Sequence, residues 1–214
     1  MNDSEFFTIQ NSIESLLVIK KSKFIANATP VENQEEAEKY LDLIRKKYWD
    51  AAHNVYAYVI GLKDEVQKFS DDGEPAGTAG RPVLEVIKSK GLKNVLVVVT
   101  RYFGGILLGA GGLARAYSDS AGTALEKAGI IKKIKCDEYE VSIEYNMLGK
   151  VQWEIKQKNL IPGGINYTEK VSLRIYVPFS SNLNFTDYIL NITSGNAAVK
   201  WMGECYVDEA IRGG

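Results

Sequence analysis

The residues best suited to chemistry lie between Ser70 and Tyr117, in two glycine-rich loops on either side of an apolar run. This stretch holds nine of the chain's 19 glycines. It also holds three arginines, Arg81, Arg101 and Arg115, and its first loop holds three acids, Asp71, Asp72 and Glu74. Clustered glycine indicates backbone that turns tightly or lets another molecule come close. We therefore take this stretch as the functional face of the protein and the rest of the chain as its support.

The second loop, RYFGGILLGAGGLARAY, leads into an expected helix, and amides at a helix N-terminus can hold an anion such as a phosphate. Its GxGxxA match is a weak dinucleotide fingerprint, because the preceding strand does not lead directly into the first glycine. We expect the two loops to bind the phosphate-bearing backbone of a nucleic acid, with its bases stacking on aromatic rings. The expected contacts are Arg81, Arg101, Tyr102, Phe103, Gly104, Gly105, Gly109, Gly111, Gly112 and Arg115. A tight loop needed only for close helix packing explains the glycines equally well.

The acids and the only histidine, His53, are expected at the edge of this site. Asp71, Asp72 and Glu74 offer oxygen ligands for magnesium, although an acidic turn held by its own hydrogen bonds is the more common arrangement. One histidine and two distant cysteines do not make a zinc site. Histidine-dependent nucleophilic catalysis would rest on His53, and no GxSxG motif supplies a serine nucleophile. We predict no metal, no cofactor and no catalytic residue; the residues favour a protein that is not an enzyme without deciding the point.

Composition describes an ordinary soluble globular protein, with 45% apolar and 25% charged residues. The net charge of −1 gives no overall basic field for nucleic acid, so such binding would have to be local. We interpret the short basic runs, at Lys20, Lys21 and Lys23 for example, as solvated edges of strands or helices. No signal peptide or membrane-length apolar segment is present, so we expect a cytoplasmic protein without membrane contact.

Hydrophobic spacing predicts the elements that must position these loops. Two strands are expected within residues 15–31, then a helix over 33–48 with Asn33 as N-cap. A strand follows from His53, and 64–70 pairs back onto it. The first loop precedes a helix that begins near Pro82 and ends at Gly91. The unbroken Val/Leu run over 94–100 indicates a strand buried on both faces, and 111–128 a long helix.

The pattern restarts at Glu138 and predicts a second domain. Strands are expected over 139–145, 160–167, 171–178 and 197–207, with helices over 146–159 and 183–193. The order βαββαβ is typical of a ferredoxin-like fold. We therefore predict two domains, residues 1–136 and 137–214.

The segments SDDGEPAGTAGRP and NVLVVVTRYFGGILLGAGGLARAY, with HNVYAY upstream, resemble the signature of the Impact/YigZ family in its bacterial two-domain type. The resemblance covers essentially the whole chain and implies an α+β protein. Its N-terminal domain would be a two-layer α/β domain of the ribosomal-protein domain-2-like fold. Its C-terminal domain would be ferredoxin-like and similar to late domains of elongation factor G. Eukaryotic relatives restrain a kinase pathway using an extra RWD domain for which this sequence leaves no room, so we do not expect that role.

Three functions remain as hypotheses. The translation-type folds and the arginine-glycine loops favour a non-enzymatic cytosolic factor that binds RNA or the ribosome and regulates translation. A kinase-like enzyme that binds a nucleotide or phosphate would use the same glycine-rich loop. A protein-docking module is the third hypothesis. Oligomeric state is not indicated, and a shared site requires that the two loops converge on one cleft.

Overall fold

An antiparallel sheet of five strands forms the centre of Phe6–Ile131, the first of two units in this computed structural model, which describes residues 3–209. The strand order is β2-β3-β6-β4-β5. The strands are β2 (Ile13–Ile19), β3 (Ser22–Pro30), β4 (His53–Ile60), β5 (Val66–Ser70) and β6 (Val95–Tyr102). The predicted buried strand is confirmed as β6, which lies in the middle of the sheet and is buried from Val95 to Arg101.

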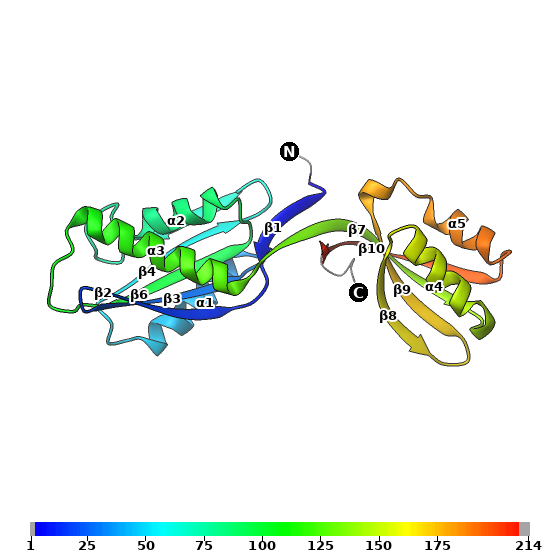
Figure 1. The fold of residues 1–214 in the computed structure, drawn as a ribbon, viewed down its shortest axis with the longest axis horizontal. Helices are drawn as coiled ribbons and strands as arrows, with labels where there is room; N and C mark the ends of the chain where they lie inside the picture. The colour runs from blue at the N-terminus through cyan, green and yellow to red at the C-terminus, as the bar shows by residue number, and fades with distance from the viewer. Residues whose placement is uncertain (1–2, 210–214) are drawn as a thin grey trace. The chain divides into compact units, whose positions relative to one another are not determined.

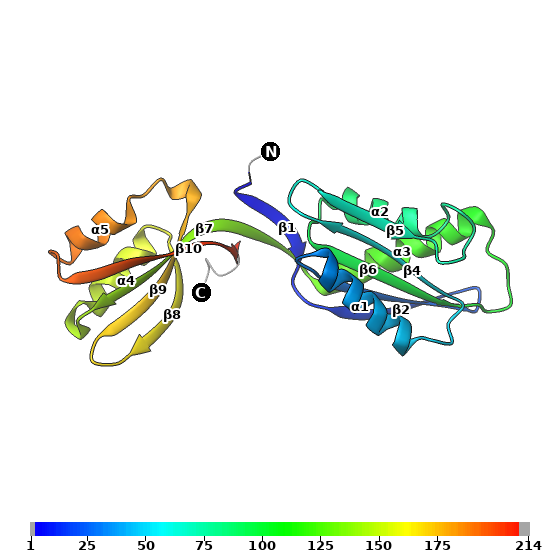
Figure 2. The same cartoon turned by 180° about the vertical axis from the view of Figure 1, so that it is seen from behind.

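Helices cover both faces of this sheet. The α2 (Gly80–Ser89) and α3 (Ala110–Ala128) helices pack on one face, where their apolar side chains join those of β3, β4 and β6 (Figure 1). The α1 helix (Gln34–Lys47) packs on the other face, against alternate residues of β4 and β6 (Figure 2). The predicted α+β class is confirmed, and α1 adds a helical layer to the two layers that the family resemblance implied.

Local sequence explains where these helices begin. Asn33 accepts the N–H of Glu36 at 2.9 Å, and the Glu36 carboxylate accepts the N–H of Glu32 at 2.9 Å, so the predicted cap of α1 is confirmed. The α3 helix places a buried stripe of small residues against the sheet, including Ala116, Ala121 and Ala124. Because these side chains are short, α3 lies close to the sheet. Tyr117 of this helix is therefore part of the apolar core of the first unit.

The second unit comprises residues 3–5 and 132–209 and has the predicted βαββαβ order. Its elements are β7 (Ile130–Ile143), α4 (Leu148–Gln157), β8 (Ile161–Tyr167), β9 (Val171–Pro178), α5 (Phe185–Ile192) and β10 (Ala197–Asp208), with short 3-10 helices at Tyr145–Met147 and Phe179–Ser181. The sheet order is β10-β7-β9-β8, and β1 (Glu5–Ile9) also pairs with β7. This is the ferredoxin-like arrangement that the sequence predicted.

The strand that opens this unit is longer than predicted. The sequence placed it at 139–145, whereas β7 begins at Ile130, and Tyr145 lies in a 3-10 helix. The charged stretch KKIKCDE lacks a clear apolar alternation, yet the β10 partner pairs with it from Lys133 onward. The structural units meet between Ile131 and Lys132, within this continuous strand. None of the helices within residues 3–209 is long and apolar enough to cross a membrane.

Candidate functional site

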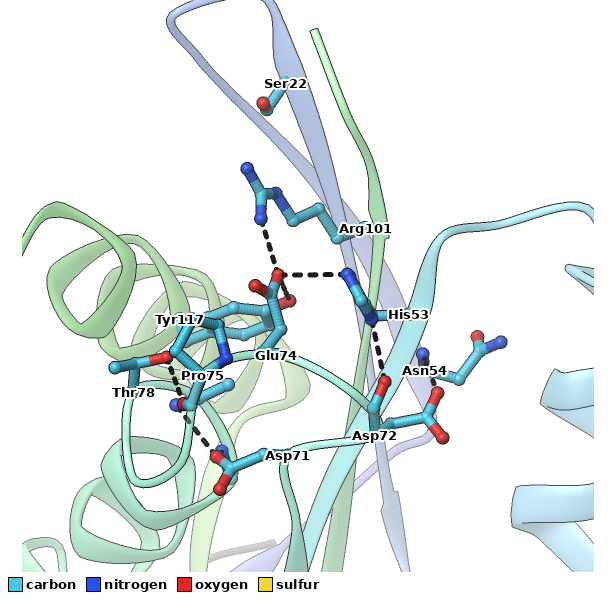
Figure 3. Close-up of polar contacts among 12 residues, drawn as sticks. Ser22, His53, Asn54, Asp71, Asp72, Glu74, Pro75, Thr78, Arg101 and Tyr117 are labelled. Carbon is cyan, nitrogen blue, oxygen red and sulfur yellow. Dashed lines mark hydrogen bonds and ion pairs between the residues drawn. The ribbon is translucent and has the colours of Figure 1, made fainter. Parts of the chain in front are cut away.

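A buried carboxylate, Glu74, is the centre of a polar cluster in the first unit (Figure 3). Arg101 of β6 donates from Nη1 to its Oε1 at 2.6 Å, and Tyr117 of α3 donates its hydroxyl to the same oxygen at 2.8 Å. The Glu74 and Arg101 side chains are only 3% and 7% exposed. Burial raises the pKa of the Tyr117 hydroxyl well above its usual range, and the bond to Glu74 raises it further. Tyr117 therefore remains a protonated donor.

His53, the first residue of β4, points toward the same carboxylate (Figure 3). Its Nδ1 lies 2.7 Å from the backbone carbonyl oxygen of Asp72. Because a carbonyl only accepts, Nδ1 carries the proton, and Nε2 of the neutral ring is an acceptor. Nε2 lies 3.9 Å from Glu74 Oε1, which is beyond hydrogen-bond distance. In the neutral ring, Nε2 and the Glu74 carboxylate are two acceptors that face each other across a gap.

The two aspartates of the first loop hold its backbone in place. Asp71 accepts three backbone N–H bonds, two at the start of α2 and one from Gly77. Asp72 accepts the N–H of Asn54 at 2.5 Å. Within residues 3–209 no group of three or more His, Cys, Asp or Glu side chains is placed to hold a metal ion. The backbone bonds of Asp71 and Asp72 match the acidic turn that the sequence offered as the more common arrangement.

An open cleft of about 320 Å³ lies beside the Glu74 cluster, and we call it the histidine cleft. Its lining is His53, Glu74, Pro75, Arg101, Phe103, Leu107, Leu108, Gly109, Ala110 and Leu113. The two glycine-rich loops therefore converge, which is the condition for a shared site. Arg101 Nε is buried without a hydrogen-bond partner in the described part of the chain. An apolar cleft with a few polar groups is the usual form of a small-ligand site.

Phe103 separates this cleft from a second one. Its ring is 52% exposed and lies 5.5 Å from the Arg101 guanidinium carbon, which packs at the same distance on Phe24. The second cleft, of about 360 Å³, is called the lysine cleft; its lining is Lys21, Lys23, Ile25, Tyr48, Tyr102 and Phe103. Tyr102 donates its hydroxyl to Asp50 at 2.7 Å, and this bond, with some burial, raises its pKa to about 12.

The tight turn between β2 and β3 holds Lys20 and Lys21 on a strained backbone. Lys20 and Lys21 have φ values of 46° and 65°, a left-handed conformation for which such turns prefer Asn-Gly. For a residue with a side chain this conformation costs about 1–2 kcal/mol. Gly104 supports the turn, since its N–H donates to Ser22 Oγ at 3.1 Å. A Cβ at Gly104 would lie 2.0 Å from the carbonyl carbon of Lys21, so only glycine allows this approach.

The remaining predicted residues are placed as follows. Gly105 and Gly109 have positive φ values of 81° and 73°, whereas Gly111 and Gly112 lie in the first turn of α3. Arg81 and Arg115 are exposed on α2 and α3, and Arg115 pairs with Asp119 at 3.6 Å. Arg101 differs from both, because its buried charge is already neutralised by Glu74. Lys21, Lys23 and Tyr48 were not among the predicted site residues. The only signal for the two lysines was the basic run between two expected strands.

Comparison with known proteins places both halves of the chain. Residues 20–125 match the Impact N-terminal domain, and residues 141–196 match a domain of unknown function, DUF1949. A solved structure titled "Crystal structure of an hypothetical protein" has a TM-score of 0.61 and 31% identity, covering 92% of this chain and 96% of that one.

Curated relatives include bacterial and eukaryotic proteins. IMPACT family member YvyE of Bacillus subtilis is 39% identical, covering 96% of this chain and 95% of its own. IMPACT family member YigZ of Escherichia coli is 35% identical over 83% of this chain and 88% of its own. Protein IMPACT-B of Xenopus tropicalis is 39% identical, over 42% of this chain and 29% of its own. As the glycine-rich signature predicted, the chain belongs to the IMPACT family.

Proposed function

We propose that this protein binds single-stranded RNA through the lysine cleft and the ring of Phe103. The observation that carries the proposal is the lining of that cleft, where two lysines stand among three aromatic side chains. Aromatic rings stack on bases of any sequence, and lysines hold the phosphates between them. Only unpaired bases offer a free face for stacking, so the substrate is a single strand or a loop. A local patch of this kind does not need an overall basic charge.

The tight turn at Lys20 and Lys21, between β2 and β3, supports the same function. Its two left-handed residues destabilise the hairpin relative to an Asn-Gly turn, and strain of this kind concentrates at functional sites. The strained conformation projects Lys21 into the lysine cleft while Gly104 fixes the position of the turn. The turn therefore carries a lysine at this position instead of the Asn-Gly pair that would make the hairpin more stable.

The arginines take different roles from those expected from the sequence. Arg101 is engaged by Glu74, so its role in this proposal is to support the Phe103 ring. Arg81 and Arg115 are exposed and remain candidates for outer phosphate contacts. We propose that the RNA belongs to the ribosome, that binding takes place in the cytoplasm, and that it regulates translation. The translation-type folds support this setting by analogy.

The direct test is fluorescence anisotropy with a labelled oligouridylate at low salt, followed by a salt titration. The Lys21→Gln/Lys23→Gln variant is expected to bind more weakly, and its salt slope should fall by about 1.4, roughly 0.7 for each phosphate that the missing lysines no longer neutralise. The matched control is Lys46→Gln/Lys88→Gln, which removes the same charge from exposed sites on α1 and α2. An equal effect of the two variants, or no binding at low salt, would refute the proposal. Co-sedimentation with ribosomes at low salt then tests the source of the RNA.

A further inference from the structure

The histidine cleft contains two polar groups that the protein itself does not satisfy. Arg101 Nε is a buried donor without a partner among the described residues. His53 Nε2 is an acceptor in the neutral ring, because the Asp72 carbonyl holds the proton on Nδ1. Glu74 cannot satisfy Nε2, since it lies 3.9 Å away and is itself an acceptor. His53 Nε2 is therefore the acceptor that the cleft offers to a ligand, while the Arg101 Nε donor is buried within its wall.

The surroundings of these two groups restrict the chemistry of that ligand. Glu74 and Arg101 neutralise each other at 2.6 Å, so the polar end of the cleft gives no net attraction to a phosphate. Leu108, Leu113 and Pro75 line the remaining walls and suit an apolar or aromatic body. The ligand that fits is uncharged, is largely apolar on its faces, and carries a hydrogen-bond donor on one edge.

We infer that the histidine cleft binds one unpaired nucleobase, whose edge donates a hydrogen bond to His53 Nε2. Unpaired bases are commonly held by stacking of their faces and by hydrogen bonds to their edges. Phe103 lines this cleft and the lysine cleft, so a strand whose phosphates lie along the lysines can place a base beyond the ring. For bases within RNA the inference rests on the proposed function; a free nucleoside is the other source of the same chemistry.

The single histidine makes the test unambiguous, because the imidazole nitrogen signals of isotope-labelled protein all come from His53. The probes are uridine, an oligouridylate of about twelve nucleotides, and an abasic oligomer of the same length. We expect the Nε2 resonance to shift with uridine and with the oligouridylate, while Nδ1 remains protonated. The abasic oligomer should leave Nε2 unchanged.

Other outcomes separate this inference from the proposed function. Binding of the oligouridylate without a shift of Nε2 overturns the base site and leaves RNA binding intact. A shift with uridine when no oligomer binds supports the base site and refutes RNA binding. A shift with the abasic oligomer overturns the inference, because the sugar and not the base then contacts His53.

A variant gives a second readout. His53→Asn keeps a donor for the Asp72 carbonyl but has no group at the Nε2 position. We expect its affinity for the oligouridylate to fall about two- to tenfold, the usual effect of removing one hydrogen bond. Hydrogen exchange of the β4 amides checks that the strand remains folded. Unchanged affinity in a folded variant contradicts the assignment of Nε2.

Discussion

Arg101 Nη1 lies 2.6 Å from Glu74 Oε1, and this ion pair joins β6 to the first glycine-rich loop inside the protein. The pair is short and almost fully buried, and Tyr117 completes it from α3. It explains why Arg101, near the end of β6 and just before a loop that resembles an anion site, is not available to an anion. Breaking such a pair by removing one partner leaves an uncompensated charge in the interior.

Glu74→Gln is therefore expected to lower the free energy of unfolding of the first unit by about 3–5 kcal/mol. Glutamine keeps the volume and an acceptor for Tyr117, so the decrease reports on charge. Hydrogen exchange of the β6 amides measures the first unit separately. The double variant Glu74→Gln/Arg101→Met should lose less stability than the sum of the single variants. Additive effects would show that the two side chains do not depend on each other.

Gly104→Ala should destabilise the first unit, because a Cβ there meets the Lys21 backbone at 2.0 Å. Overpacking of this kind costs about 1–3 kcal/mol. Gly111→Ala is the matched control, since a Cβ at this helical position meets nothing within 4 Å. It should be neutral or stabilising by up to about 1 kcal/mol. Urea unfolding followed by circular dichroism compares the stabilities of the two variants. Equal effects would contradict the close approach of Gly104 to the turn at Lys20 and Lys21.

Asp71→Ala should loosen the start of α2 and the first loop. The carboxylate accepts three backbone N–H bonds, and the removal of such a cap costs about 1–2 kcal/mol. Hydrogen exchange is expected to accelerate at Gly77 and Gly80. Asp42→Ala removes an exposed acid paired only at 3.9 Å and should change stability by less than about 0.5 kcal/mol. Unchanged exchange at Gly77 in Asp71→Ala would contradict the assigned role.

Stability should fall as pH rises above about 10, the ordinary pKa of a tyrosine. Burial raises the pKa of Tyr117 in the folded state, so above this pH the unfolded chain releases a proton that the folded protein retains. The sign is therefore a decrease of stability with rising pH, by up to about 1.4 kcal/mol per pH unit for one tyrosine. Unfolding midpoints measured from pH 8 to 11 should show a shallower decline in Tyr117→Phe. An identical decline in both proteins would exclude Tyr117 as a contributor.

Most of the helices and strands could be predicted from the sequence, because apolar periodicity and helix caps are local signals. Asn33 and the run Val95–Val99 predicted a helix start and a central strand without any tertiary information. The long β7 strand was only partly predicted, because its first half is stabilised by pairing with β10 rather than by its own pattern.

The site was harder to predict because its residues are far apart in sequence. Proximity along the chain grouped Arg101 with Arg81 and Arg115, whereas the fold pairs Arg101 with Glu74 and leaves the other two exposed. Lys23 and Tyr102 come from separate strands, and only the register of β3 against β6 places them opposite each other in one cleft. No local pattern contains that information.

The most direct test of RNA binding is the affinity of Phe103→Ala for a single-stranded oligouridylate, measured by anisotropy beside Phe69→Ala. Both phenylalanines belong to the first unit and are about equally exposed, at 52% and 43%, but only Phe103 lines the two clefts. Because stacking of one base contributes about 1–3 kcal/mol, Phe103→Ala should weaken binding by about fivefold to a hundredfold. Phe69→Ala should bind like the unmodified protein. Equal affinities of the two variants would contradict the proposal that Phe103 stacks on RNA.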